Sequence, residues 1–532
     1  MTASRWRDRP EWGQQPQWGQ PPQQEQQEQL GRWADDIPQS RLSEAEQGYT
    51  LWSTRQGRRL LTSAMLGALM FVAAWVKSPH ILAVGFVPMA TFIAIYLYRY
   101  HPTLFVSFNW WVWILTPFAR RFIEIKSGYM VTSPILLAPY LVTLPCLFTL
   151  LKHAPKLMRR HLFPFALCLA SLCYAYIVGI VSTGIAAASY GLLVWFVPLL
   201  LGFHLAMQWD IYPAMRNVMR KTLVFTVLLM GVYGVYQFLR PMPWDLFWIY
   251  AAHMTVLGNP QPMQFRVFST LNSPAPFAVI MMASLIVVMS QRSKLAWLAM
   301  GAGATALLLT TVRTAWLAWA FGFLIFAWYV PFRSISRIVF PLASLAVLVG
   351  VVTAFTPLGD VILKRFQSFG TLHDDFSLHE RANLYAAITD RVLNTPMGEG
   401  MGGTGPAATM SQGAAMQNMD SGLLDIVFSL GWFGGLVYVI GLVGLVVFAV
   451  SVRESRGDYF DLSLRAAALA TLSILPSFNS LVGVDGIVFW GFLGLCIARH
   501  FWLENYEEEE ENRVRILALE AAAAAAQQAG AA

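Results

Sequence analysis

The sequence is poor in charge and in cysteine, and each shortage excludes a class of protein. Only 13% of its 532 residues are charged, whereas a soluble domain carries about 25%, so a water-soluble domain over the whole chain is excluded. The four cysteines lie in apolar stretches and show neither the spacing of a metal site nor that of a disulfide framework. A net charge of +7 is small for this length and does not predict nucleic-acid binding.

Apolar residues are abundant instead, at 56% of the chain. Runs of about 20 apolar residues recur along it, which is the length that an α-helix needs to cross a membrane. The sequence therefore predicts an all-α, polytopic helical membrane protein with about fourteen transmembrane helices. We place these helices near residues 60–77, 80–98, 103–118, 133–151, 161–183, 189–207, 222–239, 274–291, 294–311, 313–331, 337–356, 422–451, 462–480 and 484–503.

Three regions follow from this pattern. Residues 1–50 form a Gln-, Trp- and Pro-rich tail that cannot bury enough apolar area to fold, so we expect disorder, with a role of its tryptophans in partner or membrane contact as the alternative. Residues 51–503 form the transmembrane domain, and residues 504–532 form an acidic, alanine-rich tail. Basic residues just before the first apolar run predict that both termini are cytoplasmic.

Most basic loops fall on the cytoplasmic side under this count, as expected for a membrane protein. The exception is ARRFIEIK (residues 119–126), which would lie outside, so the preceding Trp-rich segment NWWVW is interpreted as interfacial. The outer face then carries residues 240–273, the turn at Arg313 and a large loop at residues 357–421.

The large outer loop is the main candidate for chemistry, because long polar loops often carry function. Ser377 and Glu380 form a capping box that predicts a short amphipathic helix to about Leu393. Arg381 lies on the apolar face of this helix, where it needs an anionic partner: a protein carboxylate or a ligand phosphate. The glycine run Met397–Gly405 lacks the pattern of a nucleotide loop and predicts tight turning or close backbone approach.

Two further arginines, Arg266 and Arg313, have apolar neighbours on both sides. A guanidinium at such depth costs several kcal/mol unless it is paired or hydrated, and snorkelling to the interface is the structural alternative to ligand binding. Together with Arg381, they suit a membrane-embedded substrate of dense negative charge, such as a polyprenyl pyrophosphate.

Four segments, in order, resemble the motifs of the O-antigen ligase and Wzy-type polysaccharide polymerase superfamily. They are FRVFSTLNSPAPFA, with Ser269 in place of a glycine, LLLTTVRTAWLAW, HERANLYAAITDRVLNTPMGEGMG and DSGLLDIVFSLGWFGG. The resemblance covers about residues 220 to 500 and depends on the order, spacing and predicted sidedness of the motifs.

The resemblance implies a bacterial inner-membrane glycosyltransferase that acts on undecaprenyl-pyrophosphate-linked oligosaccharides at the periplasmic face, without metal or other cofactor. It implies that substrate is bound by Arg266, Arg313, Arg381, Asn272 and Gly400. Where ligases carry a histidine as the base, this chain has Asp420, which can act as a base or orient sugar hydroxyls. His373 and His379 are alternative bases, and Asp485 is a weaker candidate.

The acid at position 420 favours a polymerase of exopolysaccharide, capsule or O-antigen repeat units over a ligase that transfers a finished glycan to lipid A or protein. A transporter is a further alternative, but it predicts internal repeats and helices broken at mid-membrane, and the sequence shows no clear repeat. The expected partners are the lipid-linked oligosaccharide, membrane lipid and other assembly proteins, such as a flippase or a chain-length regulator.

Overall fold

A computed structural model describes residues 79–159, 161–330, 391–392, 394–411, 419, 421–451 and 458–505. Its regular elements are helical, and the one β-bridge recorded among these residues joins Gly258 to Phe265. The helices are α4 (Pro79–Tyr100), α5 (Pro102–Ser127), η1 (Pro134–Leu137), α6 (Ala138–Thr143), α7 (Cys146–His153), η2 (Ala154–Lys156), α8 (Phe163–Ser182), α9 (Ile185–Met207), η3 (Trp209–Ile211), α10 (Tyr212–Leu239), α11 (Pro243–Ala251), η4 (Thr255–Leu257), α12 (Pro274–Val288), α13 (Lys294–Leu309), α14 (Arg313–Tyr329), η6 (Gly405–Met410), α18 (Gly422–Ser451) and α19 (Tyr459–Leu472). A C-terminal helix follows at Gly483–Asn505.

Seven helical stretches of the described part are long and apolar enough to cross a membrane, which confirms a polytopic helical membrane protein. They are Leu82–Tyr100, Pro134–Lys156, Phe163–Ser182, Ile185–Met207, Trp209–Leu239, Gly422–Val450 and Gly483–Asn505. The total of fourteen stays a prediction, because two of the predicted helices, at 60–77 and 337–356, lie outside the described residues.

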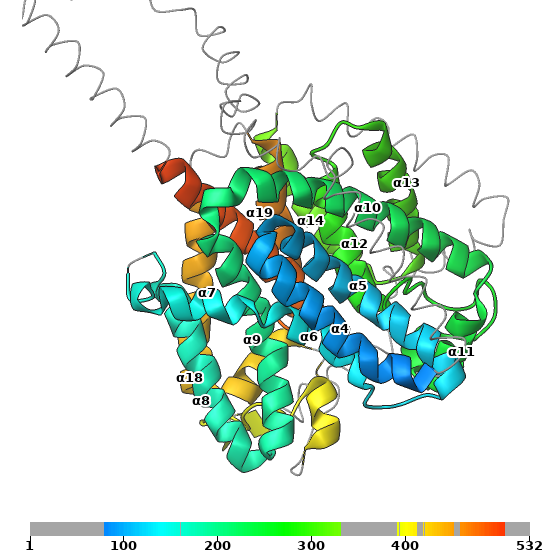
Figure 1. The fold of residues 1–532 in the computed structure, drawn as a ribbon, viewed down its shortest axis with the longest axis horizontal. Helices are drawn as coiled ribbons and strands as arrows, with labels where there is room; N and C mark the ends of the chain where they lie inside the picture. The colour runs from blue at the N-terminus through cyan, green and yellow to red at the C-terminus, as the bar shows by residue number, and fades with distance from the viewer. Residues whose placement is uncertain are drawn as a thin grey trace, which may run out of the picture.

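α10 runs through the middle of the bundle and contacts α5, α12 and α13 (Figure 1). α8 lies between α9 and α18, and α12, α14 and α19 contact one another beside the α10–α13 pair. α4 lies along α5, and α11 packs against α5. One apolar core runs through most of these helices, from Trp110 and Phe203 to Met281 and Trp490.

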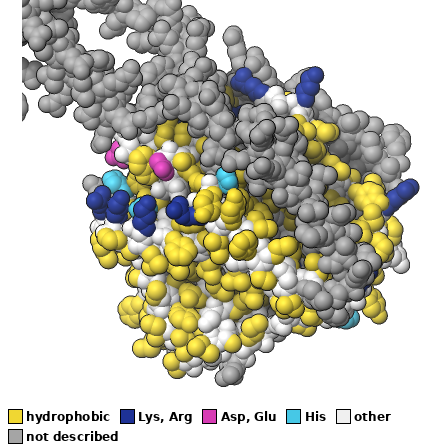
Figure 2. All heavy atoms as spheres, viewed as in Figure 1, with side chains coloured by type: hydrophobic (Ala, Val, Ile, Leu, Met, Phe, Trp, Pro, Cys, Tyr) yellow, Lys and Arg dark blue, Asp and Glu magenta, His cyan; other side chains and the backbone are white. Residues whose placement is uncertain are grey.

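The outer surface of this bundle is itself apolar. Val181 of α8, Trp328 of α14 and Phe433 of α18 expose 88%, 85% and 73% of their surface. Figure 2 shows a face dominated by hydrophobic side chains, with charged side chains gathered mainly toward its edges. An exposed apolar surface of this extent is suited to lipid rather than water.

The helix boundaries correct one sequence-based expectation. The helix predicted at 462–480 ends at Leu472, because Pro476 has no N–H to donate to the Leu472 carbonyl and its ring would crowd that group. Trp110 and Trp113 of NWWVW are buried in α5 as part of the core, and the interfacial position of this segment stays a prediction. α5 continues through ARRFIEIK, where burial of the charges is made tolerable by ion pairing.

Candidate functional site

Arg266 and Arg313, 47 positions apart in sequence, are brought to the same turn. The Arg266 side chain donates from Nε to the carbonyl of Thr310 at 2.9 Å and from Nη2 to the carbonyl of Thr311 at 3.2 Å. These carbonyls follow the end of α13, and α14 begins at Arg313. Arg266 therefore caps one helix while its neighbour Arg313 starts the next.

The turn between α13 and α14 is tightly constrained. Thr311 adopts a left-handed φ of 53°, which is unusual for a β-branched residue. The hydroxyl of Thr310 donates to the Leu307 carbonyl at 2.6 Å and accepts from the Val312 N–H at 3.2 Å. The strain at Thr311 is held in place by these bonds and by the Arg266 side chain, a pattern that clusters at functional sites.

Arg313 occupies an unusual place for a cation, because the first turn of a helix carries partial positive charge. Both the helix N-terminus and the guanidinium attract an anion, so their charges add at this point. The half-buried side chains of Arg266 and Arg313 and the start of α14 therefore lie at one turn. Its chemistry fits a phosphate or pyrophosphate group.

A buried ion pair lies beneath the segment that carries Arg266. Arg121 of α5 bonds Asp245 of α11, and both side chains are 0% exposed. The other oxygen of Asp245 accepts from the Tyr233 hydroxyl at 2.7 Å, and Arg121 also donates to the main-chain carbonyl of Ser269. This pair, called the Arg121 pair below, and the buried pair of Arg120 with Glu124 at 2.7 Å explain how charges of ARRFIEIK enter the bundle.

Asn272 lies in the same segment, two residues before the start of α12. Its main-chain carbonyl accepts from the Trp248 indole at 2.9 Å, which fixes the backbone there. Its side-chain Oδ1 is buried and has no hydrogen-bond partner among the described residues. A substrate-binding role of Asn272 stays a prediction, and this oxygen is the atom that would serve it.

Gly400 lies elsewhere, where the glycine run packs against α8, α9 and α18. Gly400 has a φ of +75°, and a Cβ there would collide with the main chain of Gly179 in α8. The Met401 N–H donates to the Ala175 carbonyl at 3.0 Å, and the Thr183 hydroxyl donates to the Met401 carbonyl at 2.8 Å. The glycine run allows close backbone approach, as predicted. Contact of Gly400 with substrate stays a prediction.

The glycine run also packs against an interruption of α18. Gly431 has a φ of 69° and interrupts the helix, and a Cβ there would meet the main chain of Met397 and Gly398. The Glu399 N–H donates to the Phe428 carbonyl at 2.8 Å just before the break. The loop backbone therefore supplies partners that an interrupted helix lacks.

Asp425 fixes the start of α18. Its two carboxyl oxygens accept from the Ser429 hydroxyl at 2.9 Å and from the Asn479 amide at 2.7 Å. The Gly422 N–H donates to the Leu475 carbonyl at 2.8 Å, so the chain entering α18 is tied to the turn after α19. Asp420, the predicted base, directly precedes this anchored entry but lies outside the described residues.

Four predicted site residues cannot be placed. Arg381, His373, His379 and Asp420 all fall outside the described residues, as does the capping box at Ser377. Asp485 is described: it lies in the first turn of the C-terminal helix, and its Oδ1 is buried without a hydrogen-bond partner among the described residues.

A second set of buried charges lies at the other end of α10. We call it the Arg216 network; it comprises Arg216, Asp458, Asp461, Arg465 and Arg499. Arg216 bonds Asp458 at 2.9 Å, and Arg465 bonds Asp461 at 2.9 Å. Arg499 reaches both acids, at 3.3 and 3.4 Å.

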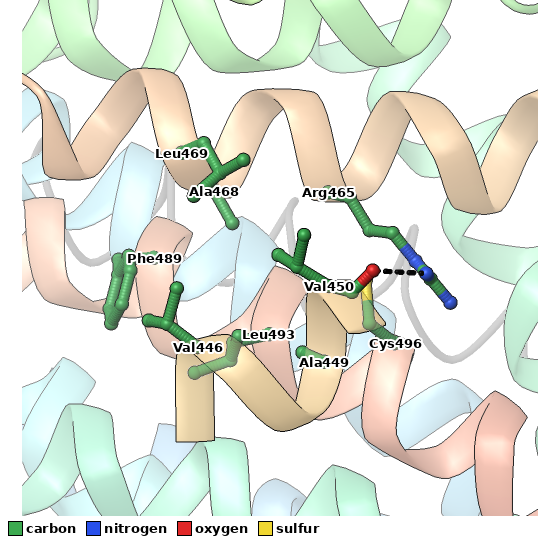
Figure 3. Close-up of a pocket in the computed structure, with 9 residues that line it drawn as sticks. All are labelled: Val446, Ala449, Val450, Arg465, Ala468, Leu469, Phe489, Leu493 and Cys496. Atoms are coloured by element: carbon green, nitrogen blue, oxygen red, sulfur yellow. Dashed lines mark hydrogen bonds between the residues drawn. The ribbon is translucent and has the colours of Figure 1, made fainter. Parts of the chain in front are cut away.

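An apolar pocket adjoins this network between α18, α19 and the C-terminal helix (Figure 3). Arg465 lies at its edge and donates to the Val450 carbonyl at 3.4 Å, while the other lining side chains are aliphatic, aromatic or the thiol of Cys496. This composition does not fit a glycan or a pyrophosphate, and we do not assign the pocket to the site.

Sequence reasoning missed Arg121, Asp245, Gln237, Asp425 and Asn479. A signal was present for the first two: ARRFIEIK contradicted the expected charge distribution, and Asp245 is an acid in an otherwise apolar PMPWDLFW. Charges that do not suit their predicted side of a membrane are often paired inside the protein. No comparable signal marked Gln237 or Asn479, because their partners are main-chain atoms or residues distant in sequence.

Comparison with known proteins gives one family match. Residues 298–439 match the Wzy_C family model, described as O-Antigen ligase. This range contains α14, most of α13 and α18, and the glycine run, but not Arg266 or the Arg121 pair. A search of the curated proteins found no match.

Proposed function

We propose, from the premise that residues 298–439 form an O-antigen ligase domain in a multi-pass membrane protein, that the chain polymerises lipid-linked glycans. Its substrate would be an undecaprenyl-pyrophosphate-linked oligosaccharide repeat unit, joined at the periplasmic face of a bacterial inner membrane. The observation that carries the proposal is the pair of hydrogen bonds from Arg266 to the Thr310–Thr311 turn, which ends where α14 starts at Arg313. The hydrogen bonds of Arg266 bring its side chain to the turn before the N-terminus of α14, where Arg313 lies, and this supports the assignment of both arginines to a pyrophosphate site.

The chemistry needed at such a site is modest. The bond between the anomeric carbon and the pyrophosphate oxygen breaks as an acceptor hydroxyl oxygen attacks from the opposite face, with inversion. Negative charge grows on the leaving pyrophosphate, where Arg266, Arg313 and Arg381 would stabilise it. A base, for which Asp420 is the first candidate, takes the proton of the acceptor hydroxyl.

The topology completes the proposal. In the described part, the Arg266 segment, the start of α14, the glycine run and the entry to α18 lie at one end of the bundle, and the Arg216 network lies at the other. We assign the first end to the periplasm and the second to the cytoplasm, with fourteen spans and both termini cytoplasmic. A flippase and a chain-length regulator would be the functional partners.

The first test is the size distribution of lipid-linked glycans in cells that lack the protein. Single repeat units stranded on the lipid would support the polymerase. Long chains stranded on the lipid and absent from their final acceptor would instead support a ligase, the second candidate, which the description of the matching family favours. An unchanged profile would contradict both and return attention to the transporter, for which the break at Gly431 is the relevant feature.

The site is tested by complementation with variants. Arg313→Ala and Asp420→Asn are expected to abolish or strongly reduce polymer, whereas Arg292→Ala should support it fully. Arg292 is a matched control, because it is exposed and lies at the opposite end of α13 from Arg313. Full polymer formation by Arg313→Ala, at wild-type protein abundance, would remove that arginine from the proposed mechanism.

A further inference from the structure

The segment that carries Arg266 is held residue by residue by surrounding helices. The Arg266 N–H donates to the Leu257 carbonyl at 2.8 Å, and the Val267 N–H donates to the Leu309 carbonyl at 3.3 Å. The Phe268 and Ser269 N–H groups both donate to Oε1 of Gln237, at 3.3 and 2.8 Å. These hydrogen bonds fix the backbone of residues 266–269, although the segment is neither helix nor strand.

Ser269 is the most constrained point of this path. Its φ of 47° is left-handed, a conformation that suits glycine. Its hydroxyl donates to the Met230 carbonyl at 2.7 Å, and its own carbonyl accepts from Arg121 Nη2 and from Gln237 Nε2 at 3.3 Å. Every hydrogen-bonding group of Ser269 is therefore engaged.

The groups that hold Ser269 are themselves rigid. Gln237 is fully buried in α10. The Arg121 guanidinium lies 5.6 Å and 4.8 Å from the ring centres of Phe118 and Phe268, and Asp245 fixes one of its amino groups. A planar guanidinium held in this way can orient a carbonyl more narrowly than a flexible ammonium.

We propose that Gln237 and Arg121 are positioning residues for Arg266. They fix the backbone at Ser269, three residues after Arg266, and so set the direction from which its guanidinium meets the Thr310–Thr311 carbonyls and a bound pyrophosphate. The inference rests on the proposed function, because it assigns the pyrophosphate to Arg266. Neither positioning residue needs to touch the substrate, since a displacement of about 1 Å at a binding group can already cost about a hundredfold in rate.

The test uses the full chain, purified in detergent, with undecaprenyl pyrophosphate alone as the probe. Gln237→Met removes the three hydrogen bonds to the segment at similar volume and is expected to weaken probe binding about tenfold. Gln291→Met is the matched control: Gln291 is also buried, and its amide donates to the Arg220 carbonyl at 3.1 Å at the opposite end of the bundle. The control should change the Kd by less than about twofold.

A double-mutant cycle separates positioning from folding. If Gln237 acts through Arg266, Gln237→Met should weaken binding much less in an Arg266→Ala background than in the wild type. Equal weakening in both backgrounds, or a lowered Tm with an unchanged Kd, would overturn the inference. If Arg266→Ala alone binds the probe like the wild type, the proposed function of Arg266 fails together with the inference. If Arg266→Ala weakens probe binding but Gln237→Met leaves the Kd unchanged, the positioning role of Gln237 is contradicted while the proposed function of Arg266 stands.

A second pair of variants serves if Gln237→Met does not fold. Ser269→Gly and Ser269→Ala both remove the bond to the Met230 carbonyl, but only glycine relieves the left-handed backbone. Binding should be weaker for Ser269→Ala than for Ser269→Gly. Equal Kd values for the two would contradict a role of this backbone geometry in placing Arg266.

Discussion

The two ends of the bundle bury charge in different ways. In the Arg216 network the charged groups chiefly satisfy one another: Asp458 has two arginine partners, and Arg499 has two acids. At the Arg266 end the Arg121 pair is a single arginine with a single acid. Asp245 also accepts from the Tyr233 hydroxyl, and Arg121 also donates to the main-chain carbonyl of Ser269. The Arg216 network holds helix ends together. The Arg121 pair also fixes the backbone of the segment that carries Arg266, a candidate binding residue.

The distance between the ends supports treating them as independent. Arg216 and Gln237 lie on the same helix, 21 residues apart in sequence, which corresponds to about 30 Å along the axis. Substitutions that far apart are expected to add in their effects on stability, since no partner is shared. The comparison can therefore be tested one end at a time.

The largest effect is expected from breaking the Arg121 pair on one side only. Arg121→Met leaves Asp245 buried without its cation and should destabilise the protein by about 3–5 kcal/mol. Arg121→Met with Asp245→Leu should recover much of this loss, because no buried charge remains. Thermal unfolding in detergent measures both. Polymer formation should stay impaired in the double variant, and full polymer formation there would reduce the pair to a structural role.

The next effect concerns the glycine run at the same end. Gly400→Ala places a Cβ against the Gly179 main chain in a left-handed conformation, so it combines overpacking with strain. We expect a loss of about 2–4 kcal/mol, seen as a lower Tm. Gly405→Ala is the control, because its φ is also positive but nothing lies near its added Cβ. Equal Tm shifts for the two would show that backbone strain, and not close packing, dominates.

A smaller loss is expected at the other end. Arg216→Met removes one partner of Asp458 but leaves Arg499, so the carboxylate stays paired. Loss of one charged hydrogen bond should cost about 1–3 kcal/mol. The amount of polymer per molecule of protein should not change. A loss of stability as large as that of Arg121→Met would contradict the view that the Arg216 network is redundant.

The smallest effect is a pH dependence from Asp458, which lies outside the candidate spans. Burial raises the pKa of its carboxyl, but Arg216 and Arg499 lower it further than burial raises it, so the net pKa is below its usual value. A carboxyl with a lowered folded-state pKa stabilises the fold above its unfolded pKa of about 3.9, and this contribution is lost as the pH falls further. The wild-type Tm should therefore decline below about pH 4 more than that of Asp458→Asn.

Several features of the site followed from local sequence. The apolar runs predicted the helices around it, and α13 and α14 begin within a residue of their predicted starts. Arg266 and Arg313 drew attention as charges in apolar surroundings, and the glycine run as a place of close approach. Local pattern is informative here because a membrane helix must satisfy its backbone within its own segment.

The end of α19 at Leu472 was also a local feature, because Pro476 in the sequence already indicated it. Other features depended on contacts between distant residues. The burial of Trp110 and Trp113 depended on which helices cover α5, and NWWVW by itself suits an interface equally well.

The sequence by itself determined that this protein is a multi-pass helical bundle, because length and apolarity set what a membrane accepts. It also showed that Arg266 and Arg313 are charges in apolar surroundings, which must be paired, hydrated or bound to a ligand. Only the tertiary structure decided that these two share one turn, that Arg121 and Gln237 hold Ser269 beside them, and that Gly400 packs on α8. Those contacts join residues from many positions in the chain, and their energies depend on distances that no local pattern specifies.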